Sequence, residues 1–115
     1  MTERAALLEH ADRLLDGSVA LGARATRVAA LLARSALEDW LDQQCAWATA
    51  PKRPSTKAKL AVLGVLDDTD LGERAKRVWH GLSRVCHHHS YELQPSPHEV
   101  RQLVAEVRRL DADRR

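Results

Sequence analysis

The sequence predicts an all-α protein, a compact up-and-down bundle of four to five helices that forms one domain over residues 1–115. Ala, Leu, Arg and Glu dominate the composition and favour helices, whereas the β-branched and aromatic residues that strands prefer are sparse. Apolar residues recur at helical intervals in five segments, which prolines, glycines and capping residues separate. At 115 residues the chain is long enough for one hydrophobic core and short for two.

Two amphipathic helices are predicted in the first half of the chain. The first ends at Gly17, and its apolar face consists of Leu7, Leu8, Ala11, Leu14 and Leu15. The second begins near Ser18, continues to Cys45 and forms the central rod of the bundle. Its apolar stripe consists of Leu21, Ala25, Val28, Leu32, Ala36 and Trp40, with Leu37, Leu41 and Cys45 beside it. Pro51 and Pro54 then place residues 49–56 in a loop.

Three further helices are predicted in the second half. A short third helix carries Leu60, Leu63 and Leu66. The fourth opens with Asp70 and Glu73, which are spaced like a capping box. Its apolar stripe, the most regular in the chain, consists of Leu71, Ala75, Val78, Leu82 and Val85, flanked by Trp79 and Cys86. The fifth starts with Ser96 as N-cap and Pro97 as first residue. Its apolar face consists of Val100, Leu103, Val104, Val107 and Leu110.

The charge of the chain does not indicate a protein that grips nucleic acid over its whole surface. The net charge is +2, and acidic and basic residues are interspersed along most of the sequence. Contacts to phosphate would therefore come from a local basic patch. The candidates for such a patch are Arg74, Lys76, Arg77, Arg84, Arg108, Arg109, Arg114 and Arg115.

The cysteines and the ends of the chain indicate the compartment. Cys45 and Cys86 lie in helical, apolar surroundings, which predicts reduced, packed thiols. No apolar run approaches the ~20 residues of a membrane span, and the first residues lack the pattern of a signal peptide. A cytoplasmic protein without membrane contact is expected, and the preference for Arg over Lys, with abundant Ala, favours a bacterial gene. No cofactor is expected.

One segment concentrates groups that can carry chemistry. Residues 84–93 read Arg-Val-Cys-His-His-His-Ser-Tyr-Glu-Leu, so imidazoles with a pKa near neutrality follow a permanent cation. Cleavage of RNA by its own 2′-hydroxyl needs a base for that proton, an acid for the leaving 5′-oxygen and a cation for the phosphate. Histidine and arginine supply all three without a metal ion. This segment is therefore the candidate catalytic site.

The spacing Arg84, four residues, His89, one residue, Tyr91 resembles the Arg-x4-His-x-Tyr motif of HEPN ribonucleases, in particular of the toxins that pair with minimal nucleotidyltransferase antitoxins. Residues 33–38, Ala-Arg-Ser-Ala-Leu-Glu, also look like the central helix of that fold. The resemblance implies a HEPN-like bundle and a metal-independent endoribonuclease. It implies that Arg84 stabilises the scissile phosphate and that His89 acts as general acid or base.

The same resemblance implies partners and a regulatory residue. HEPN domains usually dimerise so that the motifs of two protomers line one cleft, which implies a homodimer that binds an RNA substrate. In the toxin–antitoxin members the nucleotidyltransferase antitoxin adenylylates the motif tyrosine, which corresponds to Tyr91. Beside the motif, Arg77 and His87 are the candidate RNA-binding residues, although His87 also suits an exposed helix end, where the dipole favours a cation.

Helix geometry does not decide which histidine is catalytic. At ~100° per residue, Arg84 and His89 lie about 140° apart on a regular helix. His88 and Tyr91, four and seven positions after Arg84, would share its exposed face together with Arg77. Either the helix loosens near His89, or His88 takes the catalytic part.

Two other interpretations of this segment remain. Val85 stands where many HEPN ribonucleases have a polar residue, which favours a non-catalytic HEPN-like module for dimerisation or partner binding. A zinc site built from Cys86, His87, His88 and His98 is less favoured, because adjacent residues on a helix point in different directions and no second Cys or His pair has ligand spacing. No metal is therefore expected.

Overall fold

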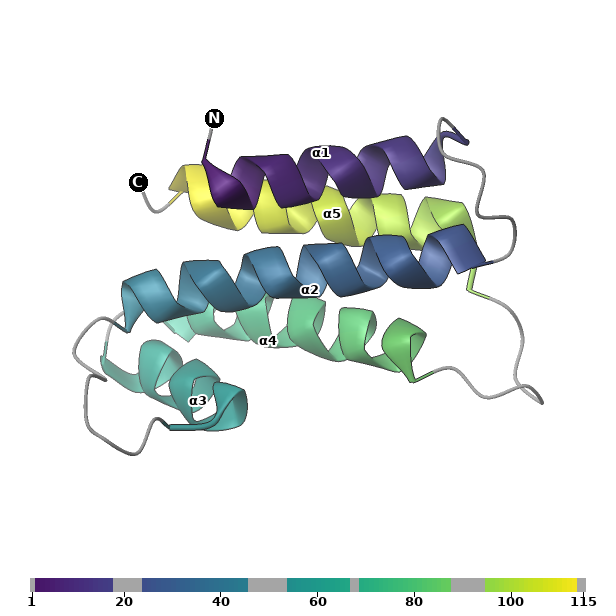
Figure 1. The fold of residues 1–115 in the computed structure, drawn as a ribbon. Coiled ribbons are helices and arrows are strands. Elements are labelled where there is room, and N and C mark those ends of the chain that lie inside the picture. Colours follow the sequence, from purple (N-terminus) through teal and green to yellow (C-terminus); the bar gives the residue numbers. More distant parts are fainter. Residues whose placement is uncertain (1, 18–23, 46–53, 67–68, 88–94, 114–115) are drawn as a thin grey trace.

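The computed structural model describes residues 2–17, 24–45, 54–66, 69–87 and 95–113, and within these ranges the chain is helical and contains no strand (Figure 1). The helices are α1 (Glu3–Leu15), α2 (Ala25–Gln44), α3 (Thr56–Leu66), α4 (Thr69–Cys86) and α5 (Pro97–Asp113). The predicted all-α fold is therefore confirmed.

Four of the helices form an up-and-down bundle. Figure 1 shows α1, α2, α4 and α5 running alternately in opposite directions, so that the two chain termini lie at the same end. Helix α2 contacts each of the other four helices, and α3 packs against α4 and α2. Because α4 and α5 are antiparallel neighbours, the end of α4 and the start of α5 lie at the opposite end of the bundle from the termini (Figure 1).

Helix α2 differs from the prediction in its start and in its most buried face. It begins at Ala25 and spans 20 residues, whereas a start near Ser18 was expected. Glycine favours helices poorly, which fits a start after Gly22; Ser18 and Leu21 lie outside the described residues. Its buried residues are Ala29, Ala30, Ala33, Ala36, Leu37, Trp40 and Leu41. Val28 and Leu32 are only partly buried. Small alanine side chains let α1, α4 and α5 approach this central helix closely.

The predicted apolar stripes of the other helices form the core. All five stripe residues of α4 are buried, and Trp79 and Cys86 pack beside them at intermediate exposure. On α5, four of the five predicted residues are buried and Leu103 is partly buried. Leu60 and Leu63 of α3 are buried, whereas nothing is described for the side chain of Leu66. One hydrophobic core therefore joins all five helices.

Helix ends follow the predicted signals in two places and depart from them in one. The Ser96 hydroxyl accepts a hydrogen bond of 3.1 Å from the Glu99 amide, which confirms the N-cap of α5. Gly17 adopts a φ of 84°, the left-handed conformation that ends helices. Helix α4 begins at Thr69, so Asp70 lies inside its first turn and not at the cap that the spacing predicted. The Thr69 hydroxyl instead donates to the Gly64 carbonyl at 3.1 Å.

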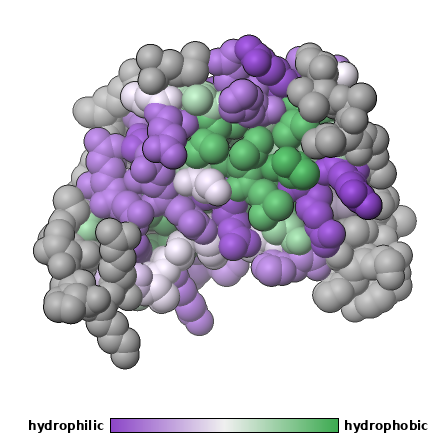
Figure 2. Space-filling view, in the orientation of Figure 1, coloured by the Kyte–Doolittle hydropathy of each residue, from purple (hydrophilic) through white to green (hydrophobic). Residues whose placement is uncertain are grey.

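Polar and apolar contacts on the surface complete the fold. The Arg4 guanidinium of α1 bonds to Asp39 and Gln43 of α2 and to Asp111 of α5, so a single side chain ties three helices together. Hydrophobic side chains gather on the face that α1 and α2 form (Figure 2). Leu31 of α2 is 45% exposed. In the described part of the chain, no helix has both the length and the apolarity that crossing a bilayer requires.

Candidate functional site: a polar groove between α4 and α5

Arg84 lies in the last turn of α4, and its side chain is exposed. Leu82, two positions before Arg84, and Val85, directly after it, are buried because they belong to the apolar stripe that faces the core. The burial of Val85 at 3% exposure explains why this position is apolar. Arg84 forms no ion pair with any residue that the structure describes. Its guanidinium donors therefore remain available to a ligand on this side of the protein.

Arg84 borders a groove of about 760 Å³ that α4 forms with one face of α5. The α5 residues that line it are His98, Glu99, Arg101, Gln102, Leu103, Ala105, Glu106 and Arg109. Three guanidinium groups and one imidazole thus meet two carboxylates. Such a groove is polar and carries a small excess of positive charge, in contrast to the near-neutral average of the chain.

The cations of α5 are partly engaged by other groups of the protein. The Arg101 Nη2 donates to the Leu15 carbonyl at 2.8 Å and so satisfies one of the last carbonyls of α1. Arg109 is paired with Glu106, one turn away on the same helix. Gln102 Nε2 and His98 Nε2 lie 3.2 Å apart. Of the three groove arginines, Arg84 is thus the one without a bond to another described residue.

Arg77 extends this polar surface along α4. It lies two turns before Arg84, at a rise of about 10 Å, and lines an adjoining hollow with Arg74, Val78, Leu103 and Glu106. Leu103 and Glu106 line both hollows. Between the two arginines, a Cβ added to Gly81 would approach Leu103 Cδ2 to 2.9 Å, so the glycine makes room for that leucine. Arg77 and Arg84 therefore face the same helix, α5.

The histidine segment begins at the end of this groove. His87 directly follows α4, is exposed, and donates its backbone N–H to the Ser83 carbonyl at 3.0 Å. His88, His89 and Tyr91 lie outside the described residues. The choice between His88 and His89 as the partner of Arg84 therefore stays a prediction, as does the role of Tyr91.

Sequence reasoning missed the contribution of α5 to this site. His98, Arg101, Gln102, Glu106 and Arg109 recur at helical spacing on the face opposite the apolar stripe. The sequence shows this polar face, but it did not indicate a site, because a polar helix face usually borders only solvent. The packing of the helices determines that α4 lies beside this face of α5 and that Arg84 borders the groove.

Cys86, which lies within the motif, packs against the hydrophobic core. Burial raises the pKa of the Cys86 thiol above its ordinary value of 9.0, although Arg34 and Arg27 act in the opposite direction. Both cysteines are free thiols, as predicted. Among the described residues no group of three or more His, Cys, Asp or Glu side chains is arranged to hold a metal ion. Of the four residues weighed for a zinc site, His88 lies outside these residues.

The fold and the groove together define a small helical bundle with a polar cleft beside a histidine-rich segment. Searches among protein families, curated proteins and solved structures found no match to this chain. The resemblance to HEPN ribonucleases is therefore limited to the sequence pattern, chiefly the motif between Arg84 and Tyr91.

Proposed function

We propose that this protein is a metal-independent endoribonuclease of the HEPN type that acts in the bacterial cytoplasm. The observation that carries the proposal is the position of Arg84. It is exposed at the edge of a polar groove, has no ion-pair partner among the described residues, and precedes three consecutive histidines. A permanent cation beside groups that exchange protons near neutral pH suits cleavage of a phosphodiester.

In the proposed reaction the 2′-oxygen of the RNA attacks the adjacent phosphorus while the bond to the 5′-oxygen breaks. His89, or His88 in its place, carries one of the two proton transfers, from the 2′-hydroxyl or to the leaving 5′-oxygen, and a second imidazole or a water molecule carries the other. Arg84 stabilises the negative charge that builds on the phosphate. The products are a 2′,3′-cyclic phosphate and a 5′-hydroxyl, and the proposed proton transfers and charge stabilisation use side chains alone.

The groove supplies the rest of the proposed binding site. Arg84 of α4 and Arg101 of α5 line the groove, and Arg77 lines the adjoining hollow, so an RNA backbone along α4 would meet cations over about 10 Å. His87 is exposed at the end of α4, and we propose that it contacts the same strand. A homodimer would bring two such grooves into one cleft, and an antitoxin with nucleotidyltransferase activity would modify Tyr91.

The proposal is tested by incubating the purified protein with single-stranded RNA and tRNA in EDTA and identifying the ends of the products. The wild type is expected to release fragments that end in a cyclic phosphate. Arg84→Ala is expected to remove the activity, as is either His89→Ala or His88→Ala, and the inactive histidine variant identifies the catalytic imidazole. Arg13→Ala, which removes an exposed arginine of α1, serves as the matched control and should cleave normally.

Two results would contradict the proposal: full activity in Arg84→Ala, or full activity in a variant in which both His88 and His89 are alanine. If Arg84→Ala protein purified by the same procedure is inactive, contamination by a host nuclease is excluded as the source of the cleavage.

A second function, a non-catalytic HEPN-like module that dimerises or binds a partner protein, is favoured by the apolar Val85 after the arginine and by the hydrophobic face over α1 and α2 (Figure 2). Under this alternative, the protein forms a tight dimer, shows no cleavage in the assay above, and loses nothing of its association when Arg84 is replaced. The cleavage assay separates the two functions, because only the endoribonuclease releases RNA fragments and depends on Arg84.

A further inference from the structure

A second pocket lies on the other side of α4 from the groove, between α4 and α3. It measures about 490 Å³, which is within the usual range for sites that hold small molecules. One face of α3 lines it with Lys57, Leu60, Ala61, Gly64 and Val65. One face of α4 completes it with Thr69, Gly72, Glu73, Lys76, Trp79 and His80.

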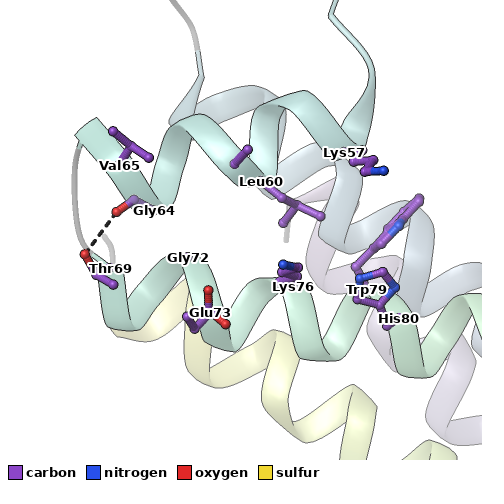
Figure 3. Close-up of a pocket in the computed structure, with 11 residues that line it drawn as sticks. Lys57, Leu60, Gly64, Val65, Thr69, Gly72, Glu73, Lys76, Trp79 and His80 are labelled. Carbon is purple, nitrogen blue, oxygen red and sulfur yellow. Dashed lines mark hydrogen bonds between the residues drawn. The ribbon is translucent and has the colours of Figure 1, made fainter.

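The pocket is apolar at one end and basic at the other. Figure 3 shows Gly64, Val65 and Thr69 at one end, and Lys57, Lys76, Trp79 and His80 towards the other. Val65 is 82% exposed, the most exposed large apolar side chain described for this chain. An occupant that covers it would gain the free energy of burying apolar surface. The shape and the charges thus favour an amphipathic ligand.

The two lysines of the basic end are not engaged by the protein. Neither Lys57 nor Lys76 forms an ion pair with a described residue, whereas Lys59, on another face of α3, is paired with Asp42. Lys57 also lies in the first turn of α3, where the helix dipole favours a negative charge. Glu73 contributes one carboxylate to the lining, so the pocket retains an excess of cations. An acidic group on the ligand would find two unpaired ammonium groups.

Trp79 provides an aromatic wall whose orientation is held from outside the pocket. The Arg34 guanidinium lies 4.8 Å from the centroid of its ring, and Arg34 does not line the pocket. Cation–π contact on the α2 side holds the indole in place, while Trp79 borders the pocket next to His80 (Figure 3). A ring or a short alkyl chain can pack against this wall.

The geometry points to a binding site between α3 and α4 for a small amphipathic anion, a molecule with one short aliphatic or aromatic body and one acidic group. The body extends from Val65 past Leu60, its part nearest the acidic group packs on Trp79, and the acidic group lies between Lys57 and Lys76. This site is separate from the proposed ribonuclease groove and does not depend on the function of that groove.

The test uses three probes of equal chain length and different charge: octanoate, octanol and octylammonium. Each is titrated into the full-length protein at millimolar concentrations, and backbone amide resonances are followed by NMR. Octanoate is expected to shift the resonances of Leu60, Val65 and Trp79 in a saturable manner. Octanol is expected to bind about 25-fold more weakly, because it pairs with neither lysine and each exposed ion pair contributes about fivefold; octylammonium should bind still more weakly.

Variants identify the residues involved. Lys57→Gln and Lys76→Gln are each expected to weaken octanoate binding by about fivefold and to leave octanol binding unchanged. Ala61→Leu, which fills the pocket from an exposed position of α3, should abolish binding of both probes. Arg13→Gln, on α1, removes a positive charge elsewhere and should change neither. Folding of every variant is checked from the same amide spectra.

Three results would overturn this proposal. If octanoate and octanol bind with equal affinity, the lysines do not favour a negatively charged ligand over an uncharged one. Octanoate shifts outside α3 and α4 would place the ligand elsewhere. A dimer that is broken by Val65→Lys and that binds no octanoate would mean that a second copy of the chain covers this surface.

Discussion

The backbones of Gly64 and Gly72 are in direct contact where α3 crosses α4. A Cβ added to Gly72 would lie 2.5 Å from the Gly64 Cα and 2.7 Å from the Gly64 nitrogen, distances that atoms of two backbones cannot adopt. A Cβ added to Gly64 would be 3.8 Å from the Gly72 Cα, an ordinary contact. The two glycines of this pair therefore have different tolerance for a methyl group.

We expect Gly72→Ala to lower the free energy of unfolding by about 1–2 kcal/mol, because overpacking costs more than the helix propensity of alanine returns. Gly64→Ala is expected to raise it by about 0.5 kcal/mol through the same propensity, since its methyl group has room. Urea denaturation followed by far-UV circular dichroism measures both. A Gly72→Ala protein as stable as Gly64→Ala would show that α3 does not pack on α4 in this way.

The Arg4 side chain is 12% exposed and donates to Asp39, Gln43 and Asp111 on two other helices. We expect Arg4→Met to lower the free energy of unfolding by about 1–2 kcal/mol, because the partly buried Asp111 of α5 loses a charged donor and the bonds that tie α1 to α2 are removed. Arg13→Met removes an exposed pair with Glu9 within α1 and should cost no more than about 0.5 kcal/mol. Thermal and urea unfolding of the two variants provide the comparison; equal losses would rule out a special role of Arg4.

Stability should fall at alkaline pH through the two cysteines. Desolvation raises the pKa of Cys45 and of Cys86 above 9.0, although Lys59 and Arg34 act in the opposite direction. The unfolded chain therefore loses these protons first as the pH rises, so the contribution of the thiols is complete below pH 9.0 and is lost as the pH passes the raised folded-state values.

The measurement is the difference in unfolding free energy between the wild type and a Cys45→Ala, Cys86→Ala variant over the neutral to alkaline range. Above pH 9.0 this difference should shrink by at most about 1.4 kcal/mol per pH unit for each thiol. A difference that is constant with pH would mean that the thiols ionise equally in the folded and unfolded states.

Replacement of Arg84 should separate function from stability. Because the side chain is exposed and has no ion-pair partner among the described residues, Arg84→Ala should change the free energy of unfolding by no more than about 0.5 kcal/mol. RNA binding, measured by fluorescence anisotropy at several salt concentrations, should weaken, with a salt slope lower by about 1 if the guanidinium contacts a phosphate. An unchanged slope would place the RNA elsewhere.

Much of the fold follows from local patterns. Spacing alone identified the buried stripe of α4 from Leu71 to Val85, and the cap residue Ser96 marked the start of α5. The exposed position of Arg84 follows from the same periodicity, since it lies between buried stripe residues. In α2 the prediction was less accurate, because the four helices around it select the alanine face over the larger Val28 and Leu32.

By itself the sequence determined that the chain forms amphipathic helices, which residues face the core, and that a cation precedes a run of histidines, because helix periodicity and side-chain chemistry are local properties. Only the tertiary structure decided that Arg84 of α4 and Arg101 of α5 line the same groove, and that Gly64 meets Gly72 where α3 crosses α4. Neighbours across two helices depend on how whole faces pack together. No short stretch of residues contains that information.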